Sequence, residues 1–503
     1  MAILGTNLDY TDKDFDALRT RLFNLISSVF PSWTARQIAN FGNLLIEMYA
    51  FVGDVLCKYQ DNQAIESRWS KATQRKNLIA LGKLIGYEPS TATASQVDVT
   101  ISIAQAVATA DTPFEAGTVV RTKSTISPVE FRLLERAVIP AGSTSITDVT
   151  AENSEPQEDV FVSSGVPNLS FILPSTPYID NSSVITAGNG VYEEVDNFLD
   201  STSTDLHYTV TVDQNDKATI RFGDGINGTI PVGTITAQYK TGGGTSGIVE
   251  AGTVTIIEGT FQAEDGTVVQ ASVTNPNAST SATDRETVSQ IKELAPLSLR
   301  VLNRTVARED YEIHAKLVSG VSRALMLTSN EETAIQENAG FLFIIPTGGG
   351  QPTQDLKDQV LEQVTETYPN TLTFNVTVSG AIFKTVDVYA RVRLSTGQNA
   401  STVKSRIETN LENFFAIEND DGTANENIDF GYAFKEDVSD NVGQLPLSDV
   451  YNVVRDTEGV RKIDASVSSF TLNGEFSDVE LLLREFPVLG TVTLINDETG
   501  AAL

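Results

Sequence analysis

Apolar residues at helical spacing dominate the first 88 residues of the chain. Phe15, Leu18 and Leu22 recur at intervals of three and four, which is typical of one face of a helix. After Pro31 a longer stripe follows, and its members are Ile38, Phe41, Leu45, Met48, Val52, Val55 and Tyr59. A third helical pattern covers residues 70–85 and ends at Gly86-Tyr87-Glu88-Pro89, a normal helix stop. The pattern predicts three helices, and the long stripe supplies more apolar surface than so small a unit needs for its own packing.

Strict alternation of apolar and polar residues replaces the helical pattern near residue 90. The run Val97–Ile103 is the clearest case, because a period of two is the pattern of a half-buried strand. Short runs of the same kind continue to residue 262, separated by Gly, Pro, Asn and Asp. Examples are residues 118–121, 145–149, 207–212, 219–222, 234–239 and 253–257. This stretch is predicted to be all β, as small barrels or sandwiches.

Helical patterns return after residue 275. The segment Thr283–Glu286 has the pattern of a capping box, which predicts a helix that opens there and runs to Lys292. Thr11–Asp14 forms a similar pattern before the first helix of the chain. A further helix is expected at residues 308–317.

Strands and helices alternate from residue 340 onward. The predicted order is strand Phe341–Ile345, helix Gln354–Thr367, strands within Val376–Leu394, helices Ser401–Phe415 and Leu447–Arg455, and strand Val460–Ser466. This succession favours split βαβ packing with the helices on one face of a sheet. The expected fold class is therefore multidomain α+β, with an N-terminal helical region, a central all-β region and a C-terminal α/β domain.

A chain of 503 residues is long enough for several domains. The expected division is a helical region at 1–89, central β domains at 90–262, a linker and helical segment at 263–338, an α/β domain at 339–467, and a strand-rich tail at 468–503.

The excess of acidic residues argues against partners that are themselves negatively charged. The chain holds 66 Asp and Glu against 35 Lys and Arg, a net charge of -31. Such a surface repels the phosphates of nucleic acids and the headgroups of anionic lipids, whose binding depends on Lys and Arg. Neither nucleic acid nor a membrane is an expected partner. A single cysteine, Cys57, excludes an intrachain disulfide and is expected to be a small core residue.

Candidate chemistry is sparse. The two histidines, His207 and His314, have no local partner for catalysis, and no Cys and His cluster offers zinc ligands. The acidic loop Glu418–Gly422 lacks the register of a calcium loop. No serine occupies a Gly-x-Ser-x-Gly turn. The sequence predicts no catalytic residue, no metal site and no cofactor.

Three glycine-rich segments could be mistaken for phosphate loops. Gly223–Gly228 has the spacing Gly-x-Gly-x-x-Gly, but turn and strand residues follow it where a dinucleotide fold needs a helix. Gly242–Gly244 and Gly348–Gly350 are not followed by Gly-Lys-Ser or Gly-Lys-Thr. All three are better interpreted as turns and connections that use the backbone freedom of glycine.

A set of short motifs occurs in a fixed order along the chain. The most distinctive is Ile220–Pro231, with Phe222, Gly223, Asp224, Gly225, Asn227, Gly228 and Pro231, followed by Gly242, Gly243 and Gly244. Asn275-Pro276, Thr283–Glu286 and Glu309–Tyr311 come after it, while Tyr10–Asp14, Glu47–Ala50 and Leu84–Tyr87 come before it. Taken in order, these motifs resemble the baseplate J-like family over most of residues 8–470. One departure is Ile248, where that family usually has Asn after the glycine.

The resemblance implies a structural role. Members of that family form the wedge of contractile phage baseplates and of related injection systems, in a ring around the tail hub. Two copies commonly pair with one companion wedge protein through N-terminal helices, the C-terminal α/β domains make ring contacts, and ring opening triggers sheath contraction. The expected partners are a second copy of the chain, a companion wedge protein, and hub and sheath-initiating proteins. The expected location is the baseplate of a virion, after assembly in the host cytoplasm.

Two hypotheses follow, one for the N-terminal apolar stripe and one for the C-terminal α/β domain. The stripe from Ile38 to Tyr59 is predicted to contact a partner in a helical bundle, and residues 340–465 are predicted to supply contacts around the ring. Two other functions stay open. A β-rich receptor-binding or glycan-binding tail protein would account for the Thr- and Ser-rich strands, though not for the two ends of the chain. A carbohydrate-active enzyme would use a pair of the many carboxylates.

Overall fold

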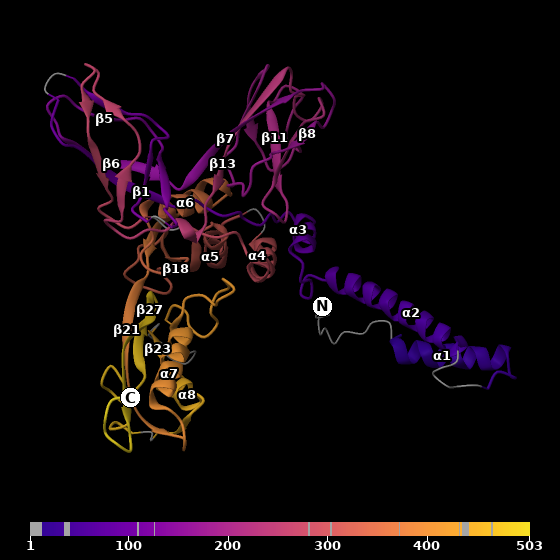
Figure 1. Cartoon of the computed structure of the whole chain (residues 1–503). Helices are drawn as coiled ribbons and strands as arrows, with labels where there is room; N and C mark the ends of the chain where they lie inside the picture. The colour runs from indigo at the N-terminus through magenta and orange to yellow at the C-terminus, as the bar shows by residue number, and fades with distance from the viewer. Residues whose placement is uncertain are drawn as a thin grey trace. The chain divides into compact units, whose positions relative to one another are not determined.

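The computed structural model describes residues 13–34, 41–107, 110–124, 126–279, 282–301, 304–371, 373–431, 433–434, 442–463 and 466–503. The chain divides into two compact units, Met1–Glu88 and Pro89–Leu503, called here the helical unit and the main unit. Helices come first, then β-sheets, then a mixture of both (Figure 1). This order confirms the predicted multidomain α+β class.

Three helices make up the helical unit: α1 (Phe15–Val29), α2 (Phe41–Glu66) and α3 (Arg75–Lys83). Helix α1 packs along α2, where Arg19 Nε lies 3.1 Å from Glu47 Oε1. A methyl group on Gly53 would come within 2.9 Å of Leu18 Cδ1, so glycine allows the close approach of the two helices. The predicted capping pattern at Thr11 and the first member of the stripe, Ile38, lie outside the described residues.

Glu66 joins the end of α2 to the start of α3. Its carboxylate accepts hydrogen bonds from Thr73 N at 3.0 Å, Thr73 Oγ1 at 2.7 Å, Gln74 N at 3.2 Å and Asn77 Nδ2 at 2.9 Å. Burial alone would raise the pKa of this carboxyl group, but these four donors outweigh it and lower the pKa to about 2. The charged carboxylate thereby satisfies free N–H groups at the start of α3.

The first β lobe contains a curled six-stranded sheet. Its order is β14-β3-β4-β6-β1-β17, with β1 (Gln96–Ile103), β3 (Val119–Thr122), β4 (Glu130–Leu133), β6 (Ser145–Glu152), β14 (Val254–Ile257) and β17 (Ala271–Thr274). Two short pairs complete the lobe: β2 (Thr112–Phe114) with β5 (Ala137–Ile139), and β15 (Phe261–Gln262) with β16 (Val268–Val269). Asn275 draws the two end strands together, because its Oδ1 accepts from Val254 N at 2.9 Å and its backbone O from Gly252 N at 2.8 Å.

The second β lobe is an insertion within the first. Its sheet has the order β7-β13-β9-β10-β11-β12-β8, with β7 (Ser154–Val162), β8 (Ser170–Ile172), β9 (Val184–Ala187), β10 (Gly190–Glu194), β11 (His207–Val212), β12 (Ala218–Phe222) and β13 (Thr234–Gly242). Aromatic side chains such as Tyr178, Tyr208 and Phe222 fill its core. The hydroxyl groups of both tyrosines stay paired there: Tyr178 donates to Ser183 Oγ and Tyr208 to Ser183 O, each at 2.9 Å.

A three-stranded sheet follows, in the order β18 (Val321–Thr328), β19 (Ala339–Pro346) and β20 (Asn375–Gly380). Helices α4 (Val288–Val301), α5 (Arg308–Leu317) and α6 (Gln354–Glu362) accompany it, and a π-helical turn η2 (Gln363–Thr367) extends α6. Strand β19 is buried on both faces. Leu342 and Ile344 pack with α5 and α6, whereas Phe343 and Ile345 belong to the next core. This explains the unbroken apolar run at Phe341–Ile345.

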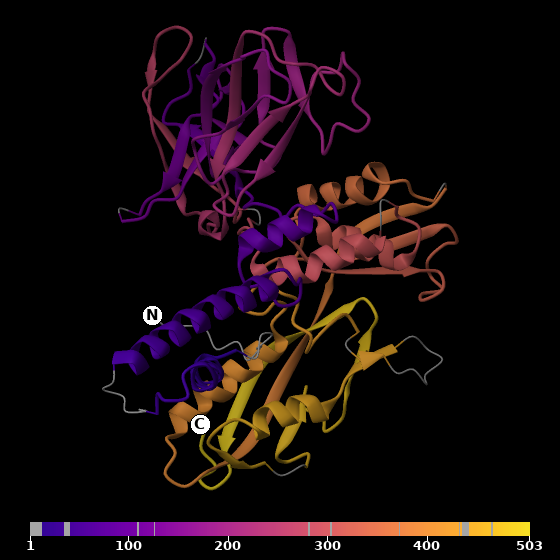
Figure 2. The same cartoon turned by 90° about the vertical axis from the view of Figure 1, so that its right-hand side faces the viewer.

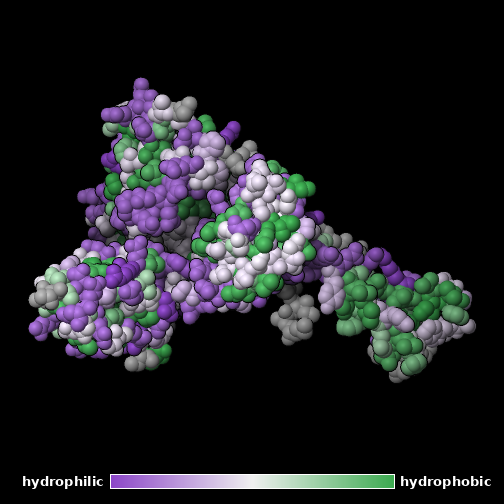
Figure 3. Space-filling view, turned by 90° about the horizontal axis from the view of Figure 1, so that it is seen from above, coloured by the Kyte–Doolittle hydropathy of each residue, from purple (hydrophilic) through white to green (hydrophobic). Residues whose placement is uncertain are grey.

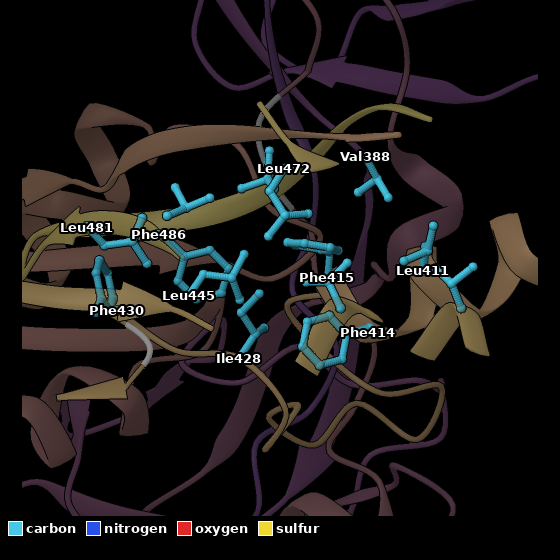
Figure 4. Packing of buried hydrophobic residues seen from close by; sticks show 14 of the residues in the cluster. Val388, Leu411, Phe414, Phe415, Ile428, Phe430, Leu445, Leu472, Leu481 and Phe486 are labelled. Atoms are coloured by element: carbon cyan, nitrogen blue, oxygen red, sulfur yellow. The ribbon is translucent and has the colours of Figure 1, made fainter. Parts of the chain in front are cut away.

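The C-terminal α/β domain is organised by two long parallel strands, β21 (Ile382–Leu394) and β27 (Glu485–Asn496). Shorter strands join them: β24 (Val460–Lys462), β25 (Phe470–Leu472), and the sheet of β22 (Ala433–Phe434), β23 (Val442–Leu445) and β26 (Val479–Leu482). Helices α7 (Ala400–Phe415) and α8 (Leu447–Arg455) lie along one side of the long strands (Figure 2). Edge-to-face pairs such as Phe414 with Phe415, at 5.2 Å between centroids, fill the space between them (Figure 4).

Some predicted elements have different bounds in the structure. The third helix, predicted at residues 70–85, spans Arg75–Lys83. The helix predicted from Thr283 to Lys292 begins only at Val288 and runs to Val301. Its true capping pair is Thr287 and Gln290: Gln290 N donates to Thr287 Oγ1 at 3.2 Å, and Thr287 N donates to Gln290 Oε1 at 2.8 Å. The Thr283–Glu286 prediction was wrong because these side chains bind segments far away in the sequence. The strand predicted at Val460–Ser466 covers only Val460–Lys462.

Candidate assembly interface and interlobe junction

Helix α2 turns its most apolar face away from α1. The buried residues near its start are Asn43, Ile46, Ala50 and Asp54. The stripe residues Phe41, Leu45, Met48, Val52 and Tyr59 are exposed, and Val55 is half-buried. With about 3.6 residues per turn, the two sets lie on opposite sides of the helix. The side that faces α1 is therefore the more polar one, and the side that faces outward is a continuous apolar surface.

The outward surface extends beyond the predicted stripe. Leu44, Tyr49, Phe51 and Leu56 on α2 are also exposed, as are Leu25 and Val29 on α1 and Phe30 after it. Hydrophobic residues predominate on these two helices in the space-filling view (Figure 3). The large apolar side chains of α2 alone present on the order of 1,000 Å², whereas the largest apolar patch on a monomer is usually about 300–600 Å². We call this surface the α2 face.

The helical unit lacks a substantial core of its own. Among the described residues, the four clusters of buried hydrophobic side chains all lie in the main unit, and α1 contributes no buried residue. A buried carboxylate, Asp54, takes part in the α1-facing side of α2 and pairs with Lys58 Nζ at 2.8 Å. Because helices in proteins are stabilised mainly by packing of an apolar face, this arrangement suits a unit that packs against something else.

The main unit has a second notable site, where the two β lobes join. The chain crosses between the lobes twice, at Asn153 between β6 and β7, and at Gly242–Gly247 between β13 and β14. Ser154 and Gly242, the first and last residues of the inserted lobe, are paired neighbours in the β7–β13 ladder. We call the segments 90–96, 152–154, 240–247 and 283–286 the interlobe junction.

Glycines are required at this junction for steric reasons. Gly243 has φ +81°, and a methyl group there would lie 2.8 Å from Thr93 O. Gly244 donates its N–H to the same Thr93 O at 2.9 Å, and a methyl group on it would lie 2.7 Å from Asp284 Oδ1. The triplet Gly242–Gly244 is therefore a tightly packed crossing and not a flexible linker.

The Thr283–Glu286 segment ties the junction together. Thr283 N donates to Thr93 Oγ1 at 2.8 Å, and Thr93 N donates to Thr283 O at 3.0 Å. Asp284 accepts from Thr245, and Glu286 Oε1 accepts from Ser90 N at 3.1 Å. These bonds hold three segments that are distant in the sequence, and no pattern within the sequence could have shown them.

An ion pair between a buried carboxylate and a half-exposed lysine reinforces the junction. Glu152 Oε1 lies 2.7 Å from Lys240 Nζ, and its other oxygen accepts from Gln96 Nε2 at 3.1 Å. Burial would raise the pKa of Glu152, but Lys240 and Ser154 outweigh burial and lower it. A cavity of about 230 Å³ beside this pair is lined by Asp180 and Asp355 among others. Glu152 and Lys240 neutralise each other, and Asp180 accepts a hydrogen bond from Thr91 N at 2.7 Å.

The motif Phe222–Pro231 forms a tight turn at the other end of β13. Asp224 Oδ1 accepts from Ile226 N at 2.8 Å and from Asn227 N at 2.7 Å, while Gly225 N donates to Gly228 O at 2.9 Å. Gly225 and Gly228 have φ +88° and +83°. A strand follows and not a helix. Residues 232–241, most of them in β13, separate this turn from Gly242–Gly244, so the two motifs do not form one site.

Neither a cluster of metal-ligating side chains nor a membrane-spanning helix occurs in the part of the chain that the structure describes. No group of three or more His, Cys, Asp or Glu side chains there could hold a metal ion. Asp421 in the acidic loop instead accepts from Thr423 N at 3.1 Å, and the loop binds the start of α4 through Thr287 Oγ1 at 2.6 Å. No described helix combines the length and hydropathy needed to cross a bilayer. Cys57, expected in a core, is half-buried.

Comparison with known families and structures gives one match to a family model. Residues 14–84 match the N-terminal domain of the bacteriophage baseplate protein family, a range that covers α1, α2 and α3. No curated protein matches the chain.

Two solved structures show distant likeness. The anti-feeding prophage baseplate, 6-fold symmetrised, gives a TM-score of 0.37 at 10% identity and covers 93% of this chain and 90% of that chain. The type VI secretion system TssK-TssF-TssG baseplate subcomplex gives 0.31 at 9% identity and covers 67% and 96%. Both TM-scores are low, and neither likeness supports a conclusion about this chain.

Proposed function

We propose that this chain is a structural, non-enzymatic subunit of the baseplate of a contractile tail or related injection system, and that the α2 face binds other baseplate subunits. Within this role, it acts as a wedge subunit of the J-like type. A companion wedge protein and a second copy of the chain are its nearest partners, and the ring that they form surrounds the tail hub.

The coincidence of the family match with the α2 face carries this proposal. Residues 14–84, which match the baseplate N-terminal domain, contain the helices whose largest apolar surface is exposed. A surface of that size clears the roughly 800 Å² per partner of a stable protein interface. A unit with little core of its own gains stability by packing such a surface against neighbouring helices.

The C-terminal α/β domain is proposed to supply contacts around the ring and to pass on the trigger for sheath contraction. A truncation after residue 340 is a poor test of this role, because it removes β19, whose Leu342 and Ile344 complete the core of the preceding segment. Surface substitutions on this domain keep that core intact and are the better test.

Assembly of a charged variant of the α2 face tests the main proposal. Phe41→Asp with Leu45→Asp, in the full chain co-expressed with the other tail subunits, is expected to abolish its incorporation into tail particles. Both side chains are exposed, so the main unit should keep its fold and its melting temperature. Co-purification and negative-stain microscopy of the particles give the readout.

A matched control adds the same charge elsewhere on the helical unit. Thr20→Asp with Asn24→Asp places two carboxylates one turn apart on the exposed side of α1, outside the α2 face. This control should assemble normally. Normal incorporation of the Phe41 and Leu45 variant would refute the proposal, and glycan binding by a chain absent from tail particles would favour the receptor-binding alternative.

A further inference from the structure

Exposed valines gather on one part of the outward face of the second β lobe. Valines at 160, 162, 184, 191 and 232 are between 49% and 77% exposed. Threonines at 186, 234 and 236 stand between them. White and green predominate over the visible end of this lobe, in contrast to the purple of most of the main unit (Figure 3). We call these eight residues the Val-Thr face.

Strand register places these side chains in ordered rows. Val160 pairs with Thr236, Thr236 with Thr186, and Thr186 with Val191, so one row crosses β7, β13, β9 and β10. Val162 and Thr234 pair in the next row toward the end of the lobe. Because side chains opposite each other across strands share a face, these two rows form one continuous uncharged surface. Val184 lies at its edge, opposite Gln238.

Val232 completes the face through a close backbone contact. Gly188 N donates to Val232 O at 2.8 Å, and a methyl group on Gly188 would lie 2.6 Å from the same oxygen. Glycine at position 188 therefore lets the segment before β13 pack onto the β9–β10 turn. On the other side, Glu158, bound to Gln238 Nε2 at 2.9 Å, and Glu193 form an acidic rim. An apolar centre with a charged rim is the usual anatomy of a protein interface.

The first β lobe shows what a solvated sheet face looks like in the same chain. The outward residues of β1 are Gln96, Asp98, Thr100 and Ser102. Asp98 Oδ1 accepts from Thr150 Oγ1 at 2.9 Å across the neighbouring strand. No valine interrupts that face of β1. The composition of the Val-Thr face therefore differs from that of the outward side of β1.

We propose that the Val-Thr face docks onto the same face of a second copy of this chain. Two copies of net charge -31 repel each other strongly, and an uncharged surface is where their approach costs least. The exposed parts of these eight side chains give on the order of 500 Å² per copy, or about 1,000 Å² in total, the lower limit of a specific interface. Two such β-branched faces can interdigitate about 10 Å apart, as in β-sandwiches.

Concentration-dependent self-association tests this inference without depending on the proposed function. The full chain is studied by analytical ultracentrifugation in the Phe41→Asp, Leu45→Asp background, so that the α2 face cannot mediate contact. A reversible dimer is expected, and added salt should strengthen it by screening the acidic rims. Val160→Glu with Val191→Glu is expected to weaken the dimer about tenfold or more, which corresponds to about 1.4 kcal/mol.

A charge-matched control and a cross-link make the test specific. Ser272→Glu with Thr274→Glu adds two carboxylates to exposed positions of β17 in the first lobe and should leave the dimer unchanged. With Cys57 replaced by Ser, Val191→Cys should form an intermolecular disulfide faster than Ser272→Cys. All variants are checked for an unchanged melting temperature.

Three outcomes would overturn the inference. A chain that stays monomeric at every concentration excludes a second copy as the occupant, as does a dimer that the Val160 and Val191 variant leaves intact. The third outcome combines two results: the chain is a monomer, and the Val160 and Val191 variant fails to enter tail particles. That outcome would show that the face binds a different protein.

Discussion

Asp284 holds Thr245 by two hydrogen bonds, from the backbone N–H and from the hydroxyl group, each at 2.9 Å. Thr245 is the first residue after the Gly242–Gly244 crossing, and Asp284 lies just before the helix α4. Two motifs that lie 39 residues apart in the sequence are thus a single contact in the fold. The contact fixes the path of the chain as it returns from the inserted lobe to the first one.

Asp284→Ala is expected to lower the free energy of unfolding of the main unit by about 0.5–1.5 kcal/mol, because it removes two exposed hydrogen bonds to Thr245 that water only partly replaces. Urea unfolding measures the loss, and hydrogen exchange at Thr245 locates it. Asp265→Ala is the matched control. Asp265 accepts from Thr267 N at 2.9 Å within one exposed turn and joins no distant segments. Equal losses in the two variants would show that the junction contact adds nothing.

Gly243→Ala separates steric cost from conformational cost when it is compared with Gly252→Ala. Both glycines have positive φ, +81° and +73°, but only Gly243 faces an atom that a methyl group would strike. Gly252→Ala should cost about 1 kcal/mol for the unfavourable backbone conformation, and Gly243→Ala about 1–3 kcal/mol more for the clash with Thr93 O. Thermal unfolding gives both values, and equal shifts would contradict the packed crossing.

Glu66 makes the stability of the helical unit depend on pH. Its folded pKa, about 2, lies below that of an unfolded Glu, so ionisation favours the folded state. The stabilisation is complete above the unfolded pKa and is lost as the pH falls from about 4.3 toward 2. The protection factors of α3 amides against hydrogen exchange, which are corrected for the intrinsic rate at each pH, should fall over this range. Glu66→Gln should remove most of that dependence and cost about 1–3 kcal/mol at neutral pH.

His314 also makes stability depend on pH, but it is a base that folding keeps neutral. Its ring is 1% exposed, stacks on Tyr368 at 4.2 Å, and contacts Arg304 O through Nε2 at 3.0 Å. Burial lowers its pKa, and the bond to Arg304 O only partly offsets this. The unfolded chain then takes up a proton first, so stability should fall as the pH drops below about 6.5. His314→Gln should flatten this slope in urea unfolding between pH 7 and 5; an unchanged slope would exclude His314 as its source.

Periodicity was sufficient to predict the elements whose environment is local. The helices predicted at 308–317 and 447–455 have those bounds in the structure, and β11 matches the run at 207–212. These segments bury one face against an adjacent element, so the spacing of their apolar residues reports their structure directly. The continuous run Phe341–Ile345 also gave a strand, because a strand buried on both faces needs apolar residues at every position.

Contacts between distant segments could not be predicted in the same way. Thr283–Glu286 has the spacing of a capping box, yet its side chains bind Ser90, Thr93 and Thr245. Capping and bridging use the same residue types, and only the fold decides between them. Likewise, the stripe on α2 indicated apolar surface, but its position opposite α1 depends on which helix face the chain buries. The sequence did not predict the Val-Thr face, because Val and Thr are also the usual residues of a strand interior.

The pairing of Ser154 with Gly242 has a consequence for the evolution and engineering of the chain. Because the inserted lobe leaves and returns at adjacent backbone positions, excising it would leave ends that a short hairpin turn can bridge. The first lobe keeps every strand of its own sheet in such a deletion. A shorter hairpin or a foreign domain could therefore replace the inserted lobe at this site, and the six-stranded sheet of the first lobe would still form.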